Sequence, residues 1–367
     1  MKKLLICILV LTIMVLPACS TNNSNDDAKT TSSDDSTYVI TDMAGREVEV
    51  PSNIDSVLSR CPIGTIIMYT LNPEKIAGLN WEPTEVEKEY LSKEYLELPM
   101  LSGWYANGKT GNVEEILKVS PDIIFSSGTS AQASIDQADE IQNKLNIPVV
   151  IIDTNLDKLE EMYTFVGKLV GEEKRAEKLS KYTKELLADV DKKAKSIKDD
   201  EKVKVYYAEG PEGLLTDPSG SEHAEVIDLV GGINVAEVEI KSGMGRSEVS
   251  PEQLVVWKPD VIITCHDQGF GGETNTYNNV LKDNRFKSLD AIKNEKVYEV
   301  PYKPFNFTDR PPSVNRLIGI LWLGNILYPD VYDYNIEDKM EEFYKLFYNV
   351  DLTDEQVDDI LSTSRLN

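Results

Sequence analysis

Residues 172–197 read EEKRAEKLSKYTKELLADVDKKAKSI, an uninterrupted helical pattern between two regions of a different kind. No Gly or Pro breaks it, and at 1.5 Å per residue the helix would be roughly 40 Å long. Its apolar residues recur every three or four positions, as one stripe of an α-helix does: Ala176, Leu179, Tyr182, Leu186, Val190, Ala194 and Ile197. A helix of this length can cross a whole domain, so we expect it to connect two lobes rigidly.

On each side of this helix, short apolar runs end at turn residues and alternate with helical patterns. The alternation predicts βαβ units with parallel strands, and hence an α/β fold in two lobes. A β-hairpin around residues 43–46 opens the first lobe. The expected strands are residues 56–59, 75–79, 122–125 and 148–152 in the first lobe, and 202–207, 261–264 and 297–300 in the second. Further helices are expected at residues 221–230, 313–327 and, in two stretches, 337–361.

The N-terminus indicates export and lipid anchoring. A positive start precedes an apolar run too short to span a membrane comfortably, and the run ends in Leu16-Pro17-Ala18-Cys19. This order matches a lipobox, in which Cys19 is lipidated and becomes the new N-terminus. An ordinary secretory signal with an incidental Cys is the alternative. Residues 20–37 are mostly Ser, Thr, Asn and Asp and cannot form a core, so we expect a flexible tether.

These patterns divide the chain into six segments. They are a signal peptide (1–18), a disordered tether (19–37), an N-terminal α/β lobe (38–155), a helical segment that includes the connecting helix (156–199), a C-terminal α/β lobe (200–310) and C-terminal helices (311–367). We expect the protein to be a monomer, anchored by lipid on the extracytoplasmic face of the cell membrane.

Charge and cysteine content narrow the possible partners. The formal charge is −25, which makes nucleic acid an unsuitable partner. Only Cys61 and Cys265 can lie in the folded part, so there is no disulfide framework. A disulfide between them across a closed cleft would prevent ligand release, and we therefore expect free thiols.

One frame occurs once in each half of the chain. Residues 112–125 (NVEEILKVSPDIIF) and 250–263 (SPEQLVVWKPDVII) each hold a short helix that begins with Glu, then Pro-Asp, then a buried strand. Glu114 and Glu252 both precede the Pro by seven positions. The repeat indicates two structurally similar lobes.

The chain from about residue 38 onward resembles the substrate-binding lipoproteins of ABC importers for iron complexes, haem and cobalamin. The resemblance rests on the lipobox, on TDMAGREVEVP (41–51), on both Glu…Pro-Asp frames and on EVIDLVGGINVA (225–236). It implies two Rossmann-like lobes joined by one long helix, with the ligand cleft between the lobes. It also implies an ABC permease and ATPase subunits as partners, and docking of Glu114 and Glu252 onto permease arginines. The alternative for each Glu is a local role, since the helix dipole favours an acidic residue in the first turn.

Candidate ligand contacts follow from the rule that ligands bind beyond the carboxyl ends of parallel strands. Trp and Tyr suit planar ligands, and Arg suits carboxylate or catecholate oxygens. The residues in these loops that we expect to contact the ligand are Arg60, Trp81, Trp104, Tyr105, Arg246, His266, Phe305 and Arg310. Ser127, Thr129 and Glu209 also lie at strand ends. For the aromatic residues and Arg246, loop packing and a surface salt bridge remain the alternatives.

Metal ligation stays open for His266. It is either a polar loop residue or a contact to the ligand or to a haem iron. A bare-metal site of Cys61, Cys265 and His266 is a further alternative. His223 precedes a predicted helix, where we expect local hydrogen bonding. We expect no intrinsic cofactor.

The function that we expect is capture of a ligand without chemistry. No GxSxG, HExxH or strand-linked GxGxxG motif occurs, and we do not expect an enzyme. A ferric siderophore, an Fe(III) complex, is the leading ligand class; haem, cobalamin or an oxyanion such as molybdate or tungstate are the alternatives. A two-lobed extracellular hydrolase or chelatase is the alternative from another class.

Overall fold

Three parallel strands form the central sheet of the N-terminal lobe, hereafter the N-lobe. Their order is β3 (Val57–Ser59), β4 (Ile123–Gly128) and β5 (Val149–Asp153), and all their residues except Gly128 are buried. The helices of this lobe are α1 (Pro62–Leu71), α2 (Glu85–Lys88), α3 (Lys93–Leu96), α4 (Val113–Val119) and α5 (Gln132–Leu145). The expected hairpin is present as β1 (Thr37–Thr41) and β2 (Glu47–Pro51). The computed structural model describes residues 36–105, 108–240, 246–266 and 275–365.

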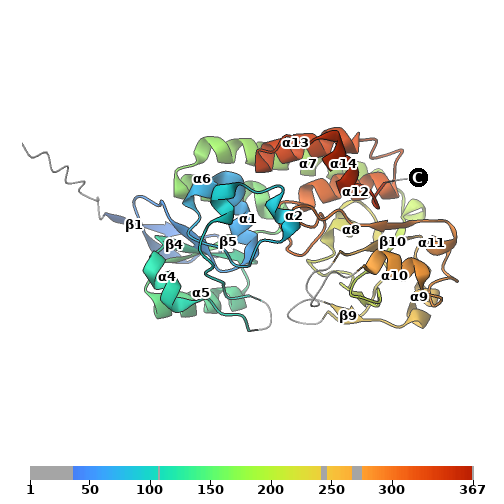
Figure 1. Ribbon diagram of the computed structural model, residues 1–367, viewed down its shortest axis with the longest axis horizontal. Helices are drawn as coiled ribbons and strands as arrows, with labels where there is room; N and C mark the ends of the chain where they lie inside the picture. Colours follow the sequence, from blue (N-terminus) through green and yellow to red (C-terminus); the bar gives the residue numbers. More distant parts are fainter. Residues whose placement is uncertain (1–35, 106–107, 241–245, 267–274, 366–367) are drawn as a thin grey trace, which may run out of the picture. The chain divides into compact units, whose positions relative to one another are not determined.

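The C-terminal lobe, hereafter the C-lobe, has four parallel strands. Their order is β11 (Val297–Glu299), β10 (Val261–Thr264), β6 (Lys204–Ala208) and β8 (Ile233–Asn234). A two-stranded ladder of β7 (Leu215–Thr216) and β9 (Ser247–Glu248) lies beside this sheet. The helices are α8 (Glu225–Leu229), α9 (Pro251–Trp257), α10 (Thr276–Lys282) and α11 (Asp290–Lys293), and Figure 1 shows the two lobes side by side.

The sequence repeat is a structural repeat. Val57 pairs with Ile123 in the N-lobe, and Val205 pairs with Val261 at the same place in the C-lobe. The aspartate of each Pro-Asp step accepts a backbone N–H at the start of the neighbouring strand: Asp122 from Ser56 at 2.8 Å, and Asp260 from Lys204 at 2.9 Å. Each frame therefore ties a short helix to its sheet in the same way.

The connecting helix is α7 (Glu173–Ala194), which follows α6 (Leu159–Val170) after a turn at Gly171. Ala176, Leu179, Leu186 and Val190 of the predicted stripe are buried. The helix packs tightly on α6 because Gly167 has no side chain: a Cβ there would lie 2.1 Å from that of Ala176. Further along, α7 packs against α8 and α12 (Arg316–Leu327) of the C-lobe. The prediction of two α/β lobes joined by one long helix is thereby confirmed.

A second helix holds the lobes together. The C-terminal helices are α13 (Ile336–Tyr348) and α14 (Asp354–Ile360), and α13 packs on both α12 and α1. Its aromatic side chains meet those of the preceding part of the chain, at Tyr69–Tyr348, Tyr90–Tyr344 and Tyr182–Phe347, with ring centroids 5.9, 5.9 and 5.5 Å apart. In Figure 1, α7 and α13 run along one side of both lobes.

One predicted strand is absent. Residues 75–79 follow a short 3₁₀ turn, Pro73–Lys75, and pair only through isolated bridges, of Ile76 with Val57 and of Leu79 with Met100. They occupy the position that β8 takes in the C-lobe, but two separate partners prevent a continuous ladder. Two other 3₁₀ turns are Leu156–Lys158 and Asp199–Glu201. Within the described residues, no helix is both long and apolar enough to cross a membrane.

Candidate functional site

The strand order places the two sheets' switch points in equivalent positions. In the N-lobe, β3 lies between residues 75–79 and β4; in the C-lobe, β6 lies between β8 and β10. The chain therefore leaves β3 and β4 in opposite directions, and it leaves β6 and β10 in opposite directions as well. Such a point leaves a crevice at the carboxyl ends of the strands. Arg60, Cys61 and Ser127 stand at this edge in the N-lobe, and Glu209 and His266 in the C-lobe.

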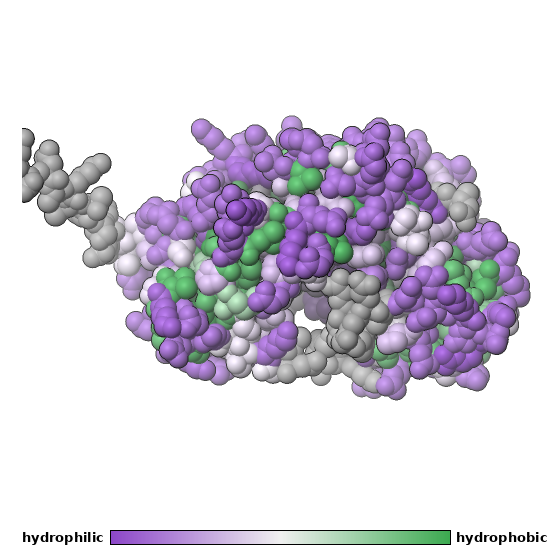
Figure 2. Space-filling view, in the orientation of Figure 1, coloured by the Kyte–Doolittle hydropathy of each residue, from purple (hydrophilic) through white to green (hydrophobic). Residues whose placement is uncertain are grey.

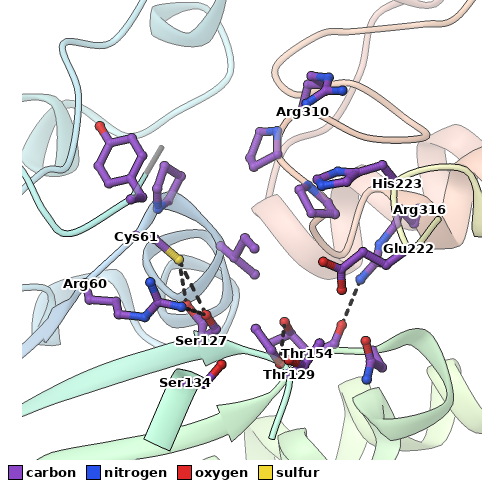
Figure 3. A pocket seen from close by; sticks show the side chains of 17 residues that line it. Arg60, Cys61, Ser127, Thr129, Ser134, Thr154, Glu222, His223, Arg310 and Arg316 are labelled. Atoms are coloured by element: carbon purple, nitrogen blue, oxygen red, sulfur yellow. Dashed lines mark hydrogen bonds between the residues drawn. The ribbon is translucent and has the colours of Figure 1, made fainter. Parts of the chain in front are cut away.

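A pocket of about 370 Å³, hereafter the arginine compartment, lies between the lobes at these edges. Figure 3 shows its residues projecting from both sides, and Figure 2 shows an opening between the lobes away from α7 and α13. The lining residues are Arg60, Cys61, Pro62, Ile63, Tyr105, Ser127, Gly128, Thr129, Ser134, Thr154 and Asn155 from the N-lobe, and Glu222, His223, Arg310, Pro311, Pro312 and Arg316 from the C-lobe. Among the described residues that line it, three arginines and a histidine thus accompany one carboxylate, that of Glu222.

In the part of the chain that the structure describes, the hydrogen-bond partners of Arg60 are all neutral oxygens. Its guanidinium donates to Ser126 Oγ at 2.9 Å and to the carbonyl oxygens of Trp104 and Ser127 at 2.9 and 3.0 Å. No carboxylate among the described residues forms an ion pair with it, although it is only partly exposed. A partly buried cation without a counter-ion favours an anionic ligand in the adjoining space.

Arg316 links the lobes at the floor of the arginine compartment. One of its nitrogens donates to the carbonyl oxygen of Thr154 in the N-lobe at 2.8 Å, and another pairs with Glu225 in the C-lobe. Figure 3 shows the first of these bonds. The side chain is almost fully buried. Its charge is therefore balanced within the protein, unlike that of Arg60.

A second pocket of about 430 Å³, hereafter the aromatic compartment, adjoins the first and shares Pro62, Tyr105, Arg310 and Pro311 with it. Its other lining residues are Trp81, Thr84, Val86, Glu87, Lys109, His266, Tyr302, Pro304, Phe305 and Asn306. His266 stacks on Tyr302 with ring centroids 3.6 Å apart, and its Nδ1 lies 3.4 Å from Glu299. Trp81 donates its Nε1–H to Glu87, whose pKa burial raises to about 7.

A buried ionic cluster holds Arg310 from behind. Three fully buried carboxylates surround its guanidinium: Glu209 at 3.0 Å, Asp217 at 2.6 Å and Asp309 at 3.2 Å. Arg246 pairs with Glu209 at 3.0 Å, and His223 Nδ1 lies 2.8 Å from Asp309. Within the described residues, three carboxylates thus contact two guanidinium groups, an excess of acidic groups that protonation of His223 or Asp217 offsets.

The pKa values of the cluster follow from this imbalance. Burial alone would lower the pKa of His223, but the Asp309 carboxylate raises it to about 9. Burial, followed by repulsion from Glu209, raises the pKa of Asp217 to about 8. Burial alone would raise the pKa of Asp309, but Arg310 and then His223 hold it at about 2. At neutral pH His223 is therefore a cation at the edge of the arginine compartment.

Asp217, His223 and Asp309 have ligand atoms within 4.8 Å of one another, close enough in principle for a metal ion. The Arg310 guanidinium already contacts both carboxylates, and a dication there would stand directly against it. The cluster is thus an arginine-holding site. Cys61, Cys265 and His266 do not gather into a metal-ligating group within the described part of the chain, and both cysteines are buried.

The His223–Asp309 pair makes stability depend on pH. Because its folded pKa lies above the ordinary 6.5, the pair stabilises the fold fully below pH 6.5 and loses this contribution as pH rises through 9. In the wild type, the pair should make the free energy of unfolding fall by roughly 2–3 kcal/mol over that range. We expect this fall to be absent in His223→Gln. Urea unfolding at pH 6, 7.5 and 9 measures it. An unchanged pH dependence in the variant would contradict the assignment.

The structure places the eight predicted ligand contacts in three groups. Arg60, Tyr105 and Arg310 line the arginine compartment, and Trp81, Phe305 and His266 line the aromatic one. Trp104 is 8% exposed and packs in the N-lobe core, where it lines neither compartment. Arg246 lies in the ionic cluster and also lines neither. For Trp104 and Arg246, contact with the ligand therefore stays a prediction.

The structure adds residues to the cleft that the sequence did not indicate. Arg316, Thr154 and Tyr302 lack any local signal for a site. His223 makes the expected local hydrogen bond, from its backbone N–H to Ser221 Oγ at 3.2 Å, but its ring pairs with Asp309, 86 residues away. Glu114 and Glu252 lie outside the cleft, each exposed at the second position of its helix.

Comparison with known proteins gives consistent matches. Residues 105–304 match the family model of periplasmic binding proteins. The uncharacterized ABC transporter substrate-binding lipoprotein YvrC of Bacillus subtilis is 25% identical over 80% of this chain and 86% of its own. The iron(3+)-hydroxamate-binding protein FhuD of the same organism is 26% identical over 56% of this chain and 66% of its own. An ABC transporter solute-binding protein from Sulfurospirillum deleyianum has 32% identity and a TM-score of 0.81, over 88% of this chain and 99% of its own.

Proposed function

We propose, since this chain belongs to the periplasmic binding protein family, that it captures a ferric siderophore outside the cytoplasmic membrane and delivers it to the permease of an ABC importer. The observation that carries the ligand class is Arg60, a partly buried guanidinium without a carboxylate partner in the described residues. An anionic iron complex supplies oxygens to it.

The presence of the aromatic compartment favours a large ligand over a small one. Ligand pockets typically measure about 300–1,000 Å³, and the two adjoining compartments each fall in this range. A tetrahedral oxyanion would contact Arg60 but leave Trp81, Tyr105 and Phe305 unused. A siderophore fills both, with its anionic oxygens in the arginine compartment and its organic frame against the aromatic rings. The similarity to an iron(3+)-hydroxamate-binding protein supports the same class.

A binding titration tests this proposal. Tryptophan fluorescence is recorded while ferric hydroxamate, ferric catecholate, haem, cobalamin or molybdate is added to the purified protein. We expect saturable quenching by a ferric siderophore with a Kd of about 1 μM or lower, typical of a specific complex. Arg60→Gln should weaken it at least tenfold, whereas Arg285→Gln, an exposed arginine paired with Asp283, should not. Binding of only haem, cobalamin or molybdate, or turnover of the added compound, would overturn it.

The lipid anchor belongs to the same proposal. Cys19 lies outside the described residues, so its role rests on the lipobox pattern. We expect Cys19→Ala to abolish labelling by a radioactive fatty acid and to move the protein from the membrane fraction to the medium or periplasm, because the acyl chains attach through that residue. Fatty-acid label that persists on the variant would contradict the lipobox.

Docking to the permease is proposed for Glu114 and Glu252. Both are exposed and stand at the second position of equivalent helices, α4 and α9. Neither lines a cleft compartment, so their carboxylates are available to basic side chains of a partner. In Figure 1 both helices lie on the side of the molecule away from α7 and α13. A permease seated there would contact both lobes.

A further inference from the structure

Arg316 lines the arginine compartment and bonds to both lobes at once. It is the first residue of α12 and is only 3% exposed. On the C-lobe side its guanidinium donates to the carbonyl oxygen of Ser313 at 3.2 Å and pairs with Glu225, the first residue of α8. Its Nη2 donates to the carbonyl oxygen of Thr154 in the N-lobe at 2.8 Å (Figure 3). The guanidinium is therefore a bridge whose two ends belong to different lobes.

The N-lobe end of this bridge is connected to Arg60. Thr154 directly follows β5, and its backbone N–H donates at 2.8 Å to the carbonyl oxygen of Gly128, the last residue of β4. One residue earlier on β4, the carbonyl oxygen of Ser127 accepts a hydrogen bond from Arg60 at 3.0 Å. A short path of hydrogen bonds thus joins the Arg60 guanidinium to the peptide that Arg316 holds. Any shift between the lobes at Thr154 also moves Arg60 relative to the C-lobe.

Other contacts between the lobes limit their relative motion less sharply. In the aromatic compartment, Trp81 and Phe305 meet edge to face with ring centroids 6.0 Å apart. Aromatic pairs accept a range of separations and offsets, whereas a hydrogen bond weakens steeply as it bends. Along one side of the molecule, α7 and α13 join the lobes and leave them able to turn about that side (Figure 1). The bridge lies at the floor of the cleft, where such a turn changes the distance between the lobes.

Breaking the bridge is unfavourable because the guanidinium is buried. A buried donor that loses its acceptor is costly, and a charged donor more so. Glu225 balances the charge of Arg316, but it cannot replace the acceptor that Thr154 supplies on the other lobe. The bridge therefore holds the lobes at one separation in the protein alone, before any ligand is bound.

We propose that Arg316 is a positioning residue, which holds the lobes at the separation at which Arg60 on one side and Arg310 on the other can contact the same ligand. The identity of that ligand rests on the proposed function, whereas the spacing of the lobes does not. Without the bridge, the lobes sample a wider range of angles, and the arrangement that binds becomes one part of the population. If that part falls to about a tenth, the apparent Kd rises about tenfold.

The first measurement needs no ligand. Spin labels at Lys144→Cys and Lys287→Cys, exposed positions of the N-lobe and the C-lobe, report the distance between the lobes by double electron–electron resonance in the full-length protein. We expect a narrow distance distribution with Arg316 present and a broader one in Arg316→Met. Arg316→Lys should broaden it as well, because a single ammonium lacks the fork of donors that reaches both Thr154 and Glu225. The wild-type protein, labelled in the same way, gives the background from its own cysteines.

The matched control is Arg46→Met. Arg46 resembles Arg316 in pairing with carboxylates, of Asp42 at 3.0 Å and Asp139 at 2.7 Å, and in donating to a carbonyl oxygen, that of Val149 at 2.9 Å. All these partners belong to the N-lobe, and Arg46 lines neither compartment. Its loss should therefore leave the distance distribution narrow. Circular dichroism and urea unfolding show that each variant is folded. Arg316→Lys, which keeps the buried charge, carries the test if Arg316→Met does not fold.

The second measurement separates positioning from direct contact with the ligand. Stopped-flow quenching of tryptophan fluorescence follows the binding of a ferric hydroxamate complex. Association should be about tenfold slower in both Arg316 variants, because fewer molecules hold the binding arrangement. Dissociation should remain as in the wild type, because the contacts to the bound ligand are the same. Arg46→Met should match the wild type in both rates.

Each outcome decides the proposal. A narrow distribution in both Arg316 variants would overturn it, whether or not the ligand binds. Faster dissociation with normal association, or full rescue of binding by Arg316→Lys, would also overturn it, because Arg316 would then act by touching the ligand. If the distribution broadens but no ferric hydroxamate binds the wild type, the proposed ligand fails and the spacing role of Arg316 stands.

Discussion

Replacing Arg310 with alanine is expected to lower the free energy of unfolding by about 3–5 kcal/mol, the usual cost of removing one partner from a buried ionic group. Glu209, Asp217 and Asp309 are fully buried around this guanidinium, and one oxygen of each has no hydrogen-bond partner in the part of the chain that the structure describes. Without Arg310 their repulsion is opposed mainly by Arg246 and His223. Urea unfolding at pH 8 measures the loss.

The pH dependence distinguishes charge from packing in this variant. Carboxyl groups left without their cation bind protons more tightly in the folded chain than in the unfolded chain, so the deficit should shrink as the pH falls from 8 to 5.5. Arg285→Ala, which removes an exposed arginine from Asp283 and Glu212, should lower the free energy of unfolding far less than Arg310→Ala at either pH. A deficit of equal size at both pH values would mean that lost packing dominates.

The largest effect on transport is expected from the paired glutamates. Glu114→Ala together with Glu252→Ala should reduce uptake of ferric siderophore by whole cells at least tenfold, and each single change only a few-fold. An exposed ion pair contributes little alone, but two contacts at a fixed separation act bivalently, so that losing both costs far more than losing one. Ligand affinity by calorimetry should remain unchanged.

The control pair for this experiment is Glu185→Ala with Glu341→Ala. Both residues are exposed, and they lie on α7 and α13, on the side of the molecule away from α4 and α9 (Figure 1). Their removal changes the net charge equally and should leave uptake normal. Normal uptake by the Glu114/Glu252 double variant, or a parallel loss of ligand affinity, would refute the docking role.

Periodicity and repetition predicted the fold because they report burial directly. Ala176, Leu179, Leu186 and Val190 of the stripe are buried along α7, and the Pro-Asp frames mark β4 and β10. Residues 75–79 failed as a strand for a reason invisible in the sequence. Their apolar pattern suits an extended segment. A strand, however, needs one neighbouring strand that pairs with it along its length, and here Ile76 and Leu79 pair with two different segments.

The site was predicted only as far as strand ends reveal it. Arg60 follows β3 directly, so topology alone brings it to the cleft. Trp104 also belongs to a loop near the cleft, but the sequence does not tell which way a loop side chain turns, and it turns into the core. The ionic cluster joins Glu209, Asp217 and Asp309 across about a hundred positions, and no spacing rule links them.

The late position of α13 in the sequence has a consequence for the order of folding. Tyr69 and Tyr90 of the N-lobe pack against Tyr348 and Tyr344, which follow them by more than 250 positions. Contacts between residues so far apart form slowly, because a long loop must close before they are made. We therefore expect the N-lobe to complete its packing only after α13 has docked, so that the two lobes mature together rather than one after the other.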